Sequence, residues 1–354
     1  MKRIICIILT ITLILGTTLN GDKLIKAKEV EHLGEIKPAS SAWLSAKPTK
    51  ILLYPSIKIV NKESQKKLNG TKLATVQVLY DREDISFLIT WRDDTKDVKQ
   101  KDHNISDIDK FAIQFVKTVE IKKLPFIEFG NKGRSVISYS QEAYATNKTE
   151  PPKISISEGF DNTKEIKEQN ITLKLNMEYA NNGWKGTLTR PLIDKYLDLN
   201  RSSIPVSFAI WDKNIKLISG WVGVSLSSQK NDSLLNRLSK KAKGNIKKGE
   251  KLYISNCIKC HKTDENQSIA QKIAPDLSNI GGYSNIDYLI ESIVKPNAII
   301  VSKNFNLDNN NSNWYKIDNN NTKISTMPSF EYLDKASIID IVTYLQTLKA
   351  KADK

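Results

Sequence analysis

Short runs of alternating hydrophobic and polar residues fill the chain between about residues 40 and 228. In "TVQVLYDREDISFLITWRD", Val76 and Val78 alternate with polar residues, a polar turn follows, and Phe87 and Ile89 resume the alternation. This pattern predicts a β-hairpin with one buried face. Similar runs follow, separated by Gly, Asn, Asp and Pro: "DKFAIQFVK", "RSVISYS", "ITLKLNMEYA", "GWKGTLTRPL", "VSFAIWD" and "SGWVGVSLS". Many short strands with turn signals predict an antiparallel β-sandwich over residues 40–228, with a barrel as the alternative.

The pattern becomes helical from about residue 248. A last helix is predicted to begin at an N-cap, Asp334, and to collect five apolar residues on one face: Ile338, Ile341, Val342, Leu345 and Leu348. We therefore expect an all-α domain over residues 248–350, so that the protein is multidomain. The basic stretch 229–247 is expected to be a linker, and the Asn-rich stretch 304–321 a surface loop.

The first residues have the pattern of a secretory signal. Two basic residues precede an apolar run from Ile4 to about Leu15, which is shorter than the roughly 20 residues of a membrane-spanning helix. We predict a cleaved signal peptide over residues 1–22, with an uncleaved anchor as the alternative. No second apolar stretch of spanning length follows, so we expect an exported protein, in the periplasm or an equivalent lumen, with no transmembrane helix after cleavage.

The net charge of +15 is concentrated before residue 248. Residues 229–247 alone hold six basic residues and one acid. A basic excess is typical of proteins that bind nucleic acid, anionic lipid or an acidic partner. Export argues against nucleic acid, so we interpret most of the charge as solvated surface and the linker as a candidate docking patch.

The motif "CIKCH" holds the two cysteines that remain after signal cleavage, Cys257 and Cys260, followed directly by His261. It allows three interpretations, namely a haem attachment site, half of a zinc site, or a redox-active thiol pair. A zinc site needs more ligands, but the chain has no second cysteine pair, and His32 and His103 lie far away in the sequence. A thioredoxin-like dithiol needs a βαβ setting, whereas this neighbourhood is helical. The spacing favours haem: each thiol forms a thioether to one vinyl group, and the imidazole of His261 binds the iron.

A sixth ligand for the iron is expected downstream of the motif. Met327, in "ISTMPSF", is the only methionine there, and no histidine follows His261. A lone methionine is otherwise expected to pack in a core. With the haem motif present, we predict one covalently bound haem c with His261 and Met327 as axial ligands.

Three segments resemble a class I cytochrome c domain: "GEKLYISNCIKCH", "IAPDLSNIGGY" and "TMPSFEYLDKASIIDIVTYLQTL". The resemblance covers roughly residues 246–350. It implies that Cys257 and Cys260 hold the haem, that His261 and Met327 are axial ligands, and that Pro275 orients the histidine side. It also implies that the first and last helices cross, where Tyr253 and Tyr344 would meet.

The strand-rich region, residues 40–226, is similar to the haem-binding domain of ethylbenzene dehydrogenase gamma subunits and their relatives in nitrite oxidoreductases. The residues that carry this resemblance are "SAWLSAKPTKILLYP", "VQVLYDREDISFLITWRDDTKD", "DKFAIQFV", "LPFIEFGNKGRSV", "GWKGTLTRPL" and "VSFAIWD". It implies a second, b-type haem, held by a methionine and a lysine.

The expected ligands of a b-type haem are missing from their places. Glu128 and Phe129 stand where the methionine is expected, and Trp221 and Val222 where the lysine is expected. The methionine of this region, Met177, lies in another predicted strand, and a lysine ligand from Lys213 or Lys216 stays open. The missing ligands therefore disfavour a second, b-type haem, which stays an alternative.

Together these observations predict an exported electron-transfer protein without substrate chemistry, because Met327 would complete the coordination of the iron. The resemblance implies a gamma-like or accessory subunit of a molybdopterin oxidoreductase such as nitrite oxidoreductase. Its partners would be molybdopterin catalytic and iron-sulfur subunits and a soluble c-type cytochrome. The alternative is a structural or assembly subunit whose sandwich has lost its b-type haem and mainly binds partner subunits.

Overall fold

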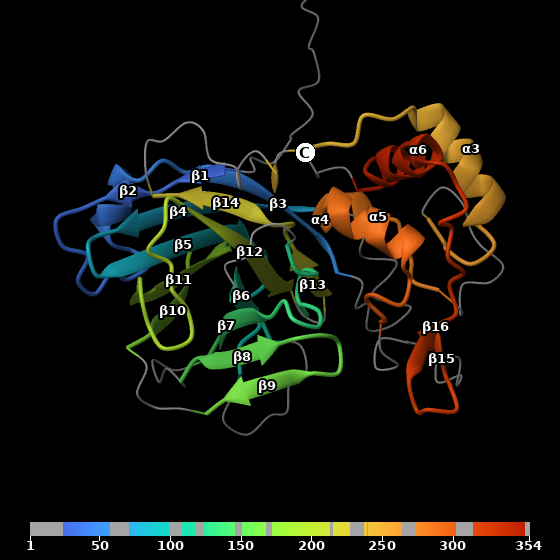
Figure 1. Cartoon of the computed structure of the whole chain (residues 1–354). Coiled ribbons are helices and arrows are strands. Elements are labelled where there is room, and N and C mark those ends of the chain that lie inside the picture. Colours follow the sequence, from blue (N-terminus) through green and yellow to red (C-terminus); the bar gives the residue numbers. More distant parts are fainter. Residues whose placement is uncertain are drawn as a thin grey trace, which may run out of the picture.

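The computed structural model describes these residues: 24–56, 71–99, 108–117, 124–145, 151–167, 172–212, 215–226, 237–238, 240–263, 274–301 and 314–350. The predicted signal peptide, His103 and Lys213 lie outside the described residues. Figure 1 shows a sheet region followed in the chain by a smaller helical region.

The sheet region consists of strands from residue 24 to residue 225. They are β1 (Leu24–Lys26), β2 (Lys28–Glu29), β3 (Thr49–Pro55), β4 (Lys72–Tyr80), β5 (Asp84–Arg92), β6 (Lys110–Val116), β7 (Val136–Glu142), β8 (Lys153–Ser157), β9 (Thr163–Ile166), β10 (Lys174–Tyr179), β11 (Gly183–Pro191), β12 (Ser203–Asp212), β13 (Ile215–Ile218) and β14 (Val222–Ser225). A short 3-10 helix, η1 (Ser41–Ser45), precedes β3.

The strands pair in the order β10-β11-β5-β4-β3-β13-β12-β6-β7-β8-β9, with β14 between β12 and β1, and β2 beside β4. The pairs are antiparallel except β1 with β14 and β2 with β4, which are parallel. The predicted hairpin is present: β4 pairs with β5 in the register Val76–Ile89 and Val78–Phe87.

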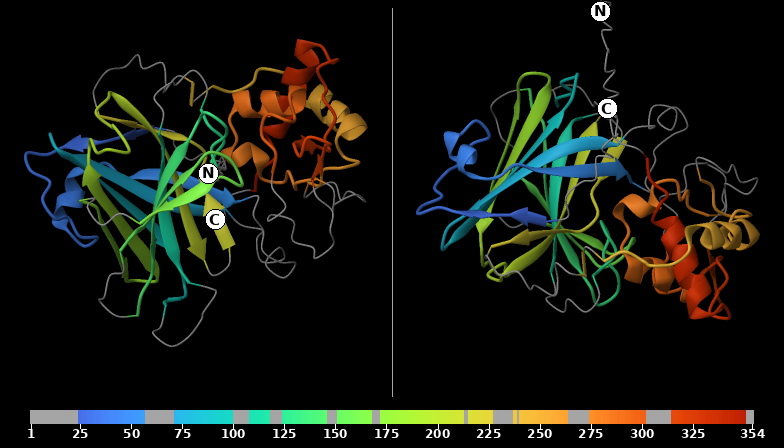
Figure 2. Two further views of the ribbon diagram at one scale, coloured as in Figure 1. Left: turned by 60° about the horizontal axis from the view of Figure 1, so that its bottom comes forward. Right: turned by 90° about the horizontal axis from the view of Figure 1, so that it is seen from above.

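The two halves of this pairing order pack face to face, as the two layers of strands in Figure 2 show. The ring of Phe87 on β5 lies 5.6 Å from Phe115 on β6 and 6.5 Å from Phe208 on β12. The predicted antiparallel sandwich is therefore confirmed, since its core is built from the alternating apolar residues of both layers. The short strands β1 and β2 were not predicted, and they extend this region to before residue 40.

The helical region contains α3 (Ile246–Asn256), α4 (Ile280–Tyr283), α5 (Ile286–Val294) and α6 (Lys335–Leu345). The Asp334 carboxylate accepts a hydrogen bond from the Ser337 N–H and caps α6, and the predicted apolar face of α6 is buried. A small hairpin, β15 (Tyr315–Ile317) and β16 (Lys323–Ser325), is added to the helices. The predicted helical C-terminal domain is confirmed, and the small hairpin is an addition to it. The surface loop predicted over 304–321 is corrected only at β15, and residues 304–313 lie outside the described residues.

Helices α3 and α6 cross at very short range. A Cβ atom on Gly249 of α3 would lie 2.0 Å from the Asp340 carbonyl oxygen of α6. Beside the crossing, the rings of Tyr253 and Tyr344 are 5.3 Å apart, so the predicted contact of these two residues is confirmed.

The two regions share a hydrophobic contact. Tyr54 of β3 packs against α4, where a Cβ atom on Gly282 would lie 2.5 Å from its ring. The ring of Phe126 lies 4.6 Å from that of Tyr288 on α5, and the Arg134 guanidinium is 3.6 Å from the Glu291 carboxylate. These contacts hold α4 and α5 against the sheet region, on the side that carries β3 and β13 in Figure 1.

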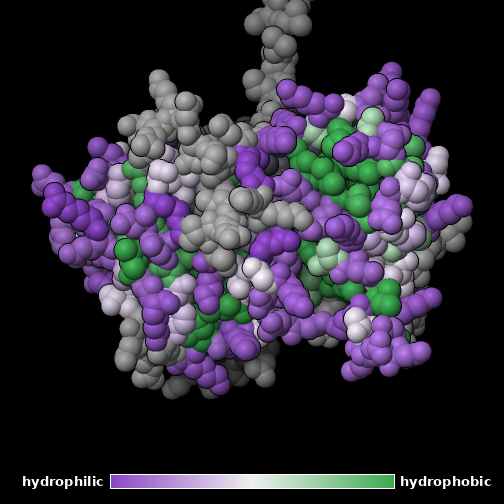
Figure 3. All heavy atoms as spheres, in the orientation of Figure 1, coloured by the Kyte–Doolittle hydropathy of each residue, from purple (hydrophilic) through white to green (hydrophobic). Residues whose placement is uncertain are grey.

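The surface of the two regions differs on the face shown in Figure 3. The larger hydrophobic areas there lie over the helical region, among hydrophilic residues.

Among the described residues, no helix is both long enough and apolar enough to cross a membrane.

Candidate haem site

The motif "CIKCH" lies at the end of α3 and in the turn that follows. Asn245 caps the start of the helix by accepting a hydrogen bond from the Lys248 N–H. Cys257 is the C-cap, and its carbonyl accepts hydrogen bonds from the N–H groups of Cys260 (3.0 Å) and His261 (2.9 Å). This turn brings both thiols and the imidazole to the same end of α3.

His261 is held by one hydrogen bond on its ring and by another on its backbone. Its Nδ1 lies 2.9 Å from the Pro275 carbonyl oxygen, and its own carbonyl accepts a 3.0 Å hydrogen bond from the buried Tyr253 hydroxyl. A carbonyl can only accept, so Nδ1 carries the proton and Nε2 keeps its lone pair for a metal. Burial lowers the pKa of His261, which favours the neutral imidazole that binds metals. The predicted role of Pro275 beside the histidine is thus present in the geometry.

Met327 lies in a segment that is fastened to the C-terminal end of α5. The Phe330 N–H donates to the Ile293 carbonyl (3.0 Å), and the Ser329 hydroxyl donates to the Val294 carbonyl (2.7 Å). On the other side of Met327, the Ser325 N–H donates to Asn297 (2.8 Å). Hydrogen bonds on both sides therefore fix the backbone that presents the thioether.

Cys257, Cys260, His261 and Met327 line one cavity. The other lining residues are mostly apolar and come from α5, from the segment after His261 and from the segment around Met327: they include Pro275, Leu277, Leu289, Ile293, Ile299, Val301, Pro328 and Phe330. Sequence reasoning named the four polar or sulfur-bearing residues but not this apolar wall, for which only the helical pattern of "IDYLIESIVK" gave a signal.

The geometry disfavours the two alternatives to haem. Cys257 is the C-cap of α3, whereas the lowered thiol pKa of a redox-active dithiol is typical of a helix N-terminus. In the described part of the chain, the motif does not converge with further His, Cys or carboxylate groups as a zinc site requires. Two thiols beside an oriented imidazole, with a thioether on the same apolar cavity, fit a haem that is bound through sulfur and nitrogen.

Residues 246–349 match the family model described as cytochrome c. These residues form a cytochrome c domain. The four predicted site residues all lie within this domain, which implies a covalently bound haem c.

A search of curated proteins finds no match to the chain. A family 9 carbohydrate-binding module from Caldicellulosiruptor kristjanssonii, in complex with glucose, is 9% identical, with a TM-score of 0.34 over 59% of this chain and 98% of that chain. The same module in complex with cellotriose is 9% identical, with a TM-score of 0.33 over 60% of this chain and 97% of that chain.

A putative carbohydrate-binding protein from Bacteroides uniformis is 8% identical, with a TM-score of 0.35 over 61% of this chain and 95% of that chain. Similarities at this level identify neither the family nor a ligand of the sheet region. The resemblance to ethylbenzene dehydrogenase gamma subunits stays a prediction.

The positions considered for a b-type haem are occupied by a buried polar network. The Glu128 carboxylate accepts a 2.6 Å hydrogen bond from the Ser56 hydroxyl and forms an ion pair with Lys216. The backbone of Glu128 has a positive φ of 71° and is held on both sides by the Gln114 amide. Lys216 is thus engaged with Glu128, and releasing it would leave a buried charge unpaired, at a cost of about 3–5 kcal/mol.

The remaining residues that sequence reasoning considered have structural contacts. Trp221 is buried and donates its indole N–H to the Pro125 carbonyl (3.0 Å), and Val222 lies in the sandwich core. Phe129 stacks on Phe160 with ring centres 4.4 Å apart. Met177 packs against the sandwich core, and His32 is exposed at the surface.

Proposed function

We propose that this chain is an exported electron-transfer protein that carries one covalent haem c in its cytochrome c domain. In this proposal Cys257 and Cys260 form the two thioethers, and His261 and Met327 are the axial ligands. The observation that carries it is the arrangement of these four residues on one apolar cavity, with His261 oriented by the Pro275 carbonyl.

Each residue has a defined task in this proposal. The haem supplies one-electron chemistry at its iron when it is bound. The hydrogen bond from Nδ1 of His261 to Pro275 fixes the tautomer and leaves Nε2 for the metal. Met327 would offer the haem iron a neutral, soft ligand. Such a ligand favours the reduced state of the iron more than a second histidine would. The apolar wall around Leu289, Ile293 and Phe330 excludes water and lowers the local dielectric.

Haem content tests this proposal. A pyridine haemochrome spectrum of the purified full chain should show c-type haem at one per chain, and the haem should remain on the protein after denaturation. Absence of covalent haem would contradict the proposal. The variant Met327→Ala should keep its covalent haem but lose the far-red charge-transfer band of Met-ligated ferric haem. An unchanged band would remove Met327 from the ligand set.

We further propose that the chain is a gamma-like or accessory subunit of a molybdopterin oxidoreductase of the nitrite oxidoreductase type. Molybdopterin and iron-sulfur subunits would be its partners within the complex, and a soluble c-type cytochrome its partner outside it. The sequence resemblance of residues 40–226 supports this assignment. Affinity purification from the native organism, with mass spectrometry, tests it: equal stoichiometry with a molybdopterin subunit is expected, and recovery without such a subunit would refute it.

A second candidate is a structural or assembly subunit whose sandwich has lost its b-type haem. The ion pair of Glu128 with Lys216 favours this candidate, because it engages one of the two lysines, Lys213 and Lys216, that stayed open as a ligand of a b-type haem. Haem extraction with acidified organic solvent distinguishes the two. A second, extractable haem per chain would favour the two-haem electron carrier, and its absence, with partner subunits recovered at variable ratio, would favour the structural role.

A further inference from the structure

Three aspartates meet at one end of the sheet region, at places where strands begin or end. Asp93 directly follows β5, Asp109 directly precedes β6, and Asp212 is the last residue of β12. One carboxylate oxygen of each lies within 4.8 Å of one from each of the others. Asp93 is only 4% exposed and Asp109 is 0% exposed, so two of the three are inside the protein.

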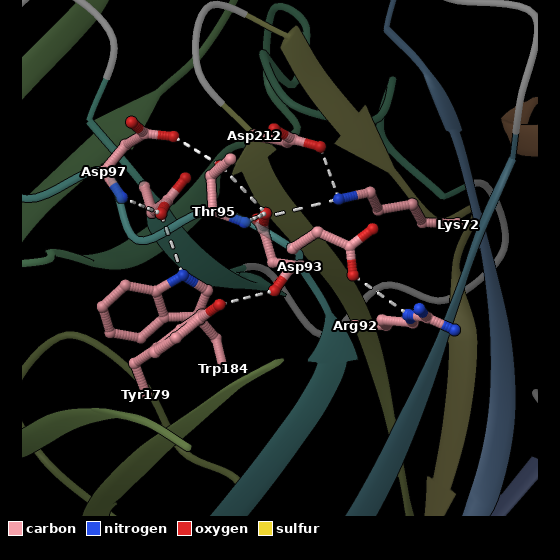
Figure 4. Close-up of polar contacts among 10 residues, drawn as sticks. Lys72, Arg92, Asp93, Thr95, Asp97, Tyr179, Trp184 and Asp212 are labelled. Atoms are coloured by element: carbon pink, nitrogen blue, oxygen red, sulfur yellow. Dashed lines mark hydrogen bonds and ion pairs between the residues drawn. The ribbon is translucent and has the colours of Figure 1, made fainter. Parts of the chain in front are cut away.

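The charges in this cluster are not balanced by the described residues around it. The Lys72 ammonium lies 2.5 Å from Asp212 and 3.7 Å from Asp93, as Figure 4 shows. Arg92 pairs instead with Asp94, on the outer side, and Asp97 adds a further carboxylate next to Thr95. One ammonium therefore stands against three clustered carboxylates, and buried charge of one sign is costly unless it is paired.

A second observation points to a missing ligand. The Oδ2 atom of Asp109 accepts hydrogen bonds from the Asp97 N–H (2.8 Å) and from the Trp184 indole N–H (2.9 Å), which fix the carboxylate. Its Oδ1 atom is buried and has no hydrogen-bond partner among the described residues. The Oδ2 atom of Asp93 is also buried and without a hydrogen bond there, and its contact is the 3.7 Å approach of Lys72.

We propose that Asp93, Asp109 and Asp212 form a binding site for a divalent cation of the Ca²⁺ class. Oxygen ligands bind Ca²⁺ at about 2.3–2.6 Å in irregular geometries, so two oxygens on one ion lie at most about 5 Å apart, as here. The cluster has no imidazole or thiolate, which Zn²⁺ and Cu²⁺ prefer. Since Lys72 is about a quarter exposed (27% of its side chain), its ammonium can leave for solvent when the cation enters.

The cation would join the two layers of the sandwich. Asp93 follows β5 in one layer, whereas Asp109 directly precedes β6 and Asp212 ends β12 in the other. A single ion would therefore cross-link three strand ends from both layers. Binding to the folded chain alone raises the stability of this region as the cation concentration rises.

The test uses the full haem-bearing chain, freed of metals with a chelator and then titrated with CaCl₂. Calorimetry should show one Ca²⁺ per chain, and the melting temperature of the sheet region should rise with Ca²⁺ relative to the chelated protein. Asp212→Asn, at a partly exposed position, should weaken binding about tenfold or more, because ligand charge sets the affinity of such sites. The matched control is Asp94→Asn, an exposed neighbour outside the cluster, which should bind like the wild type.

A variant of Lys72 separates a cation site from a simple salt bridge. Lys72→Met removes the competing ammonium, so it should bind Ca²⁺ more tightly than the wild type and should lose stability only in the presence of the chelator. The proposal is overturned if neither the wild type nor Lys72→Met binds Ca²⁺, Mg²⁺ or Mn²⁺ up to about 10 mM, beyond the weakest extracellular calcium modules. It is equally overturned if Asp212→Asn leaves the stoichiometry and affinity unchanged.

Discussion

The sheet region fills its interior with its own aromatic side chains, whereas the helical region builds its interior around a cavity. Phe87, Phe115 and Phe208 of the sandwich are completely buried against one another. In the cytochrome c domain, the thiols, the imidazole and the Met327 thioether line the centre together with an apolar wall. The first region is expected to be stable without the haem, whereas the second is expected to be stable only with a bound group that completes its core.

The largest effect is expected from removing the attachment of the cofactor. Cys257→Ala/Cys260→Ala should carry no covalent haem, and its helices should melt at a much lower temperature than in the wild type. The sandwich should keep its own transition, because its core does not include the cavity. Haem staining of denatured protein, together with thermal melts followed by circular dichroism, measures both effects.

The control for this variant is Ser255→Ala, whose hydroxyl is exposed on α3 and bonds only the Lys251 carbonyl among the described residues. It should keep both the haem and the wild-type melt. Simultaneous loss of both melting transitions in the double variant would contradict the expected independence of the sandwich, because the sandwich would then also depend on the haem.

A second prediction concerns the crossing of α3 and α6. Gly249→Ala places a Cβ atom 2.0 Å from the Asp340 carbonyl, which is backbone and cannot turn away. The helices must separate, at a cost of about 1–3 kcal/mol or more in the cytochrome c domain. Chemical denaturation followed through the haem absorbance measures it.

Lys251→Ala, on the exposed side of α3, is the matched control and should change little. If Gly249→Ala were as stable as this control, the close crossing of α3 and α6 would be contradicted.

The contact between the regions gives a third, intermediate effect. Gly282→Ala should force the Tyr54 ring away from α4, because the new Cβ atom would lie 2.5 Å from it. We expect a loss of about 1–3 kcal/mol and a wider separation of the two melting transitions. Tyr54→Ala/Gly282→Ala removes the clash, so the two substitutions should couple in a double-mutant cycle, measured by differential scanning calorimetry. Additive effects would mean that Tyr54 and α4 do not touch.

The smallest effect is expected at the start of α6. Hydrogen bonds from the Ser337 N–H and hydroxyl hold the pKa of the Asp334 carboxyl below its usual value. Because this pKa is lower in the folded state than in the unfolded state, the cap stabilises the fold fully at pH values above the ordinary pKa of Asp. This stabilisation is lost as the pH falls through the folded-state pKa. Asp334→Ala should therefore melt slightly below the wild type at neutral pH, and the difference should vanish in acid.

Asp334→Asn keeps an acceptor for the cap without a titrating group. Its melting temperature relative to Asp334→Ala should not depend on pH. A pH-independent gap between the wild type and Asp334→Ala would show that the carboxylate charge has no part in the cap.

Local patterns in the sequence predicted the features that depend on near neighbours. The spacing of Cys257, Cys260 and His261 within one turn, the N-cap at Asp334 and the alternation through Val76 and Phe87 are all set by a few consecutive residues. Each is present in the structure in the element that was expected.

Features that join distant parts of the chain gave no such signal. β1 is only three residues long and exists because it pairs with β14, about 200 residues later. The contact of Phe126 with Tyr288 and the pairing of Glu128 with Lys216 likewise join segments that no periodicity connects. The same holds for the three aspartates, which become neighbours only when three strand ends meet.

The pairing of β1 with β14 and the crossing of α3 with α6 also set the order in which the two regions can fold. The sandwich can close once residue 225 has been made, because its first strand then finds its partner. The crossing of Gly249 with Asp340 must wait until α6 exists. Domains generally fold as units and in order during synthesis, so the sheet region is expected to be complete while "CIKCH" is still in an open chain. Its cysteines would then stay accessible to whatever attaches the cofactor until the last helix closes over them.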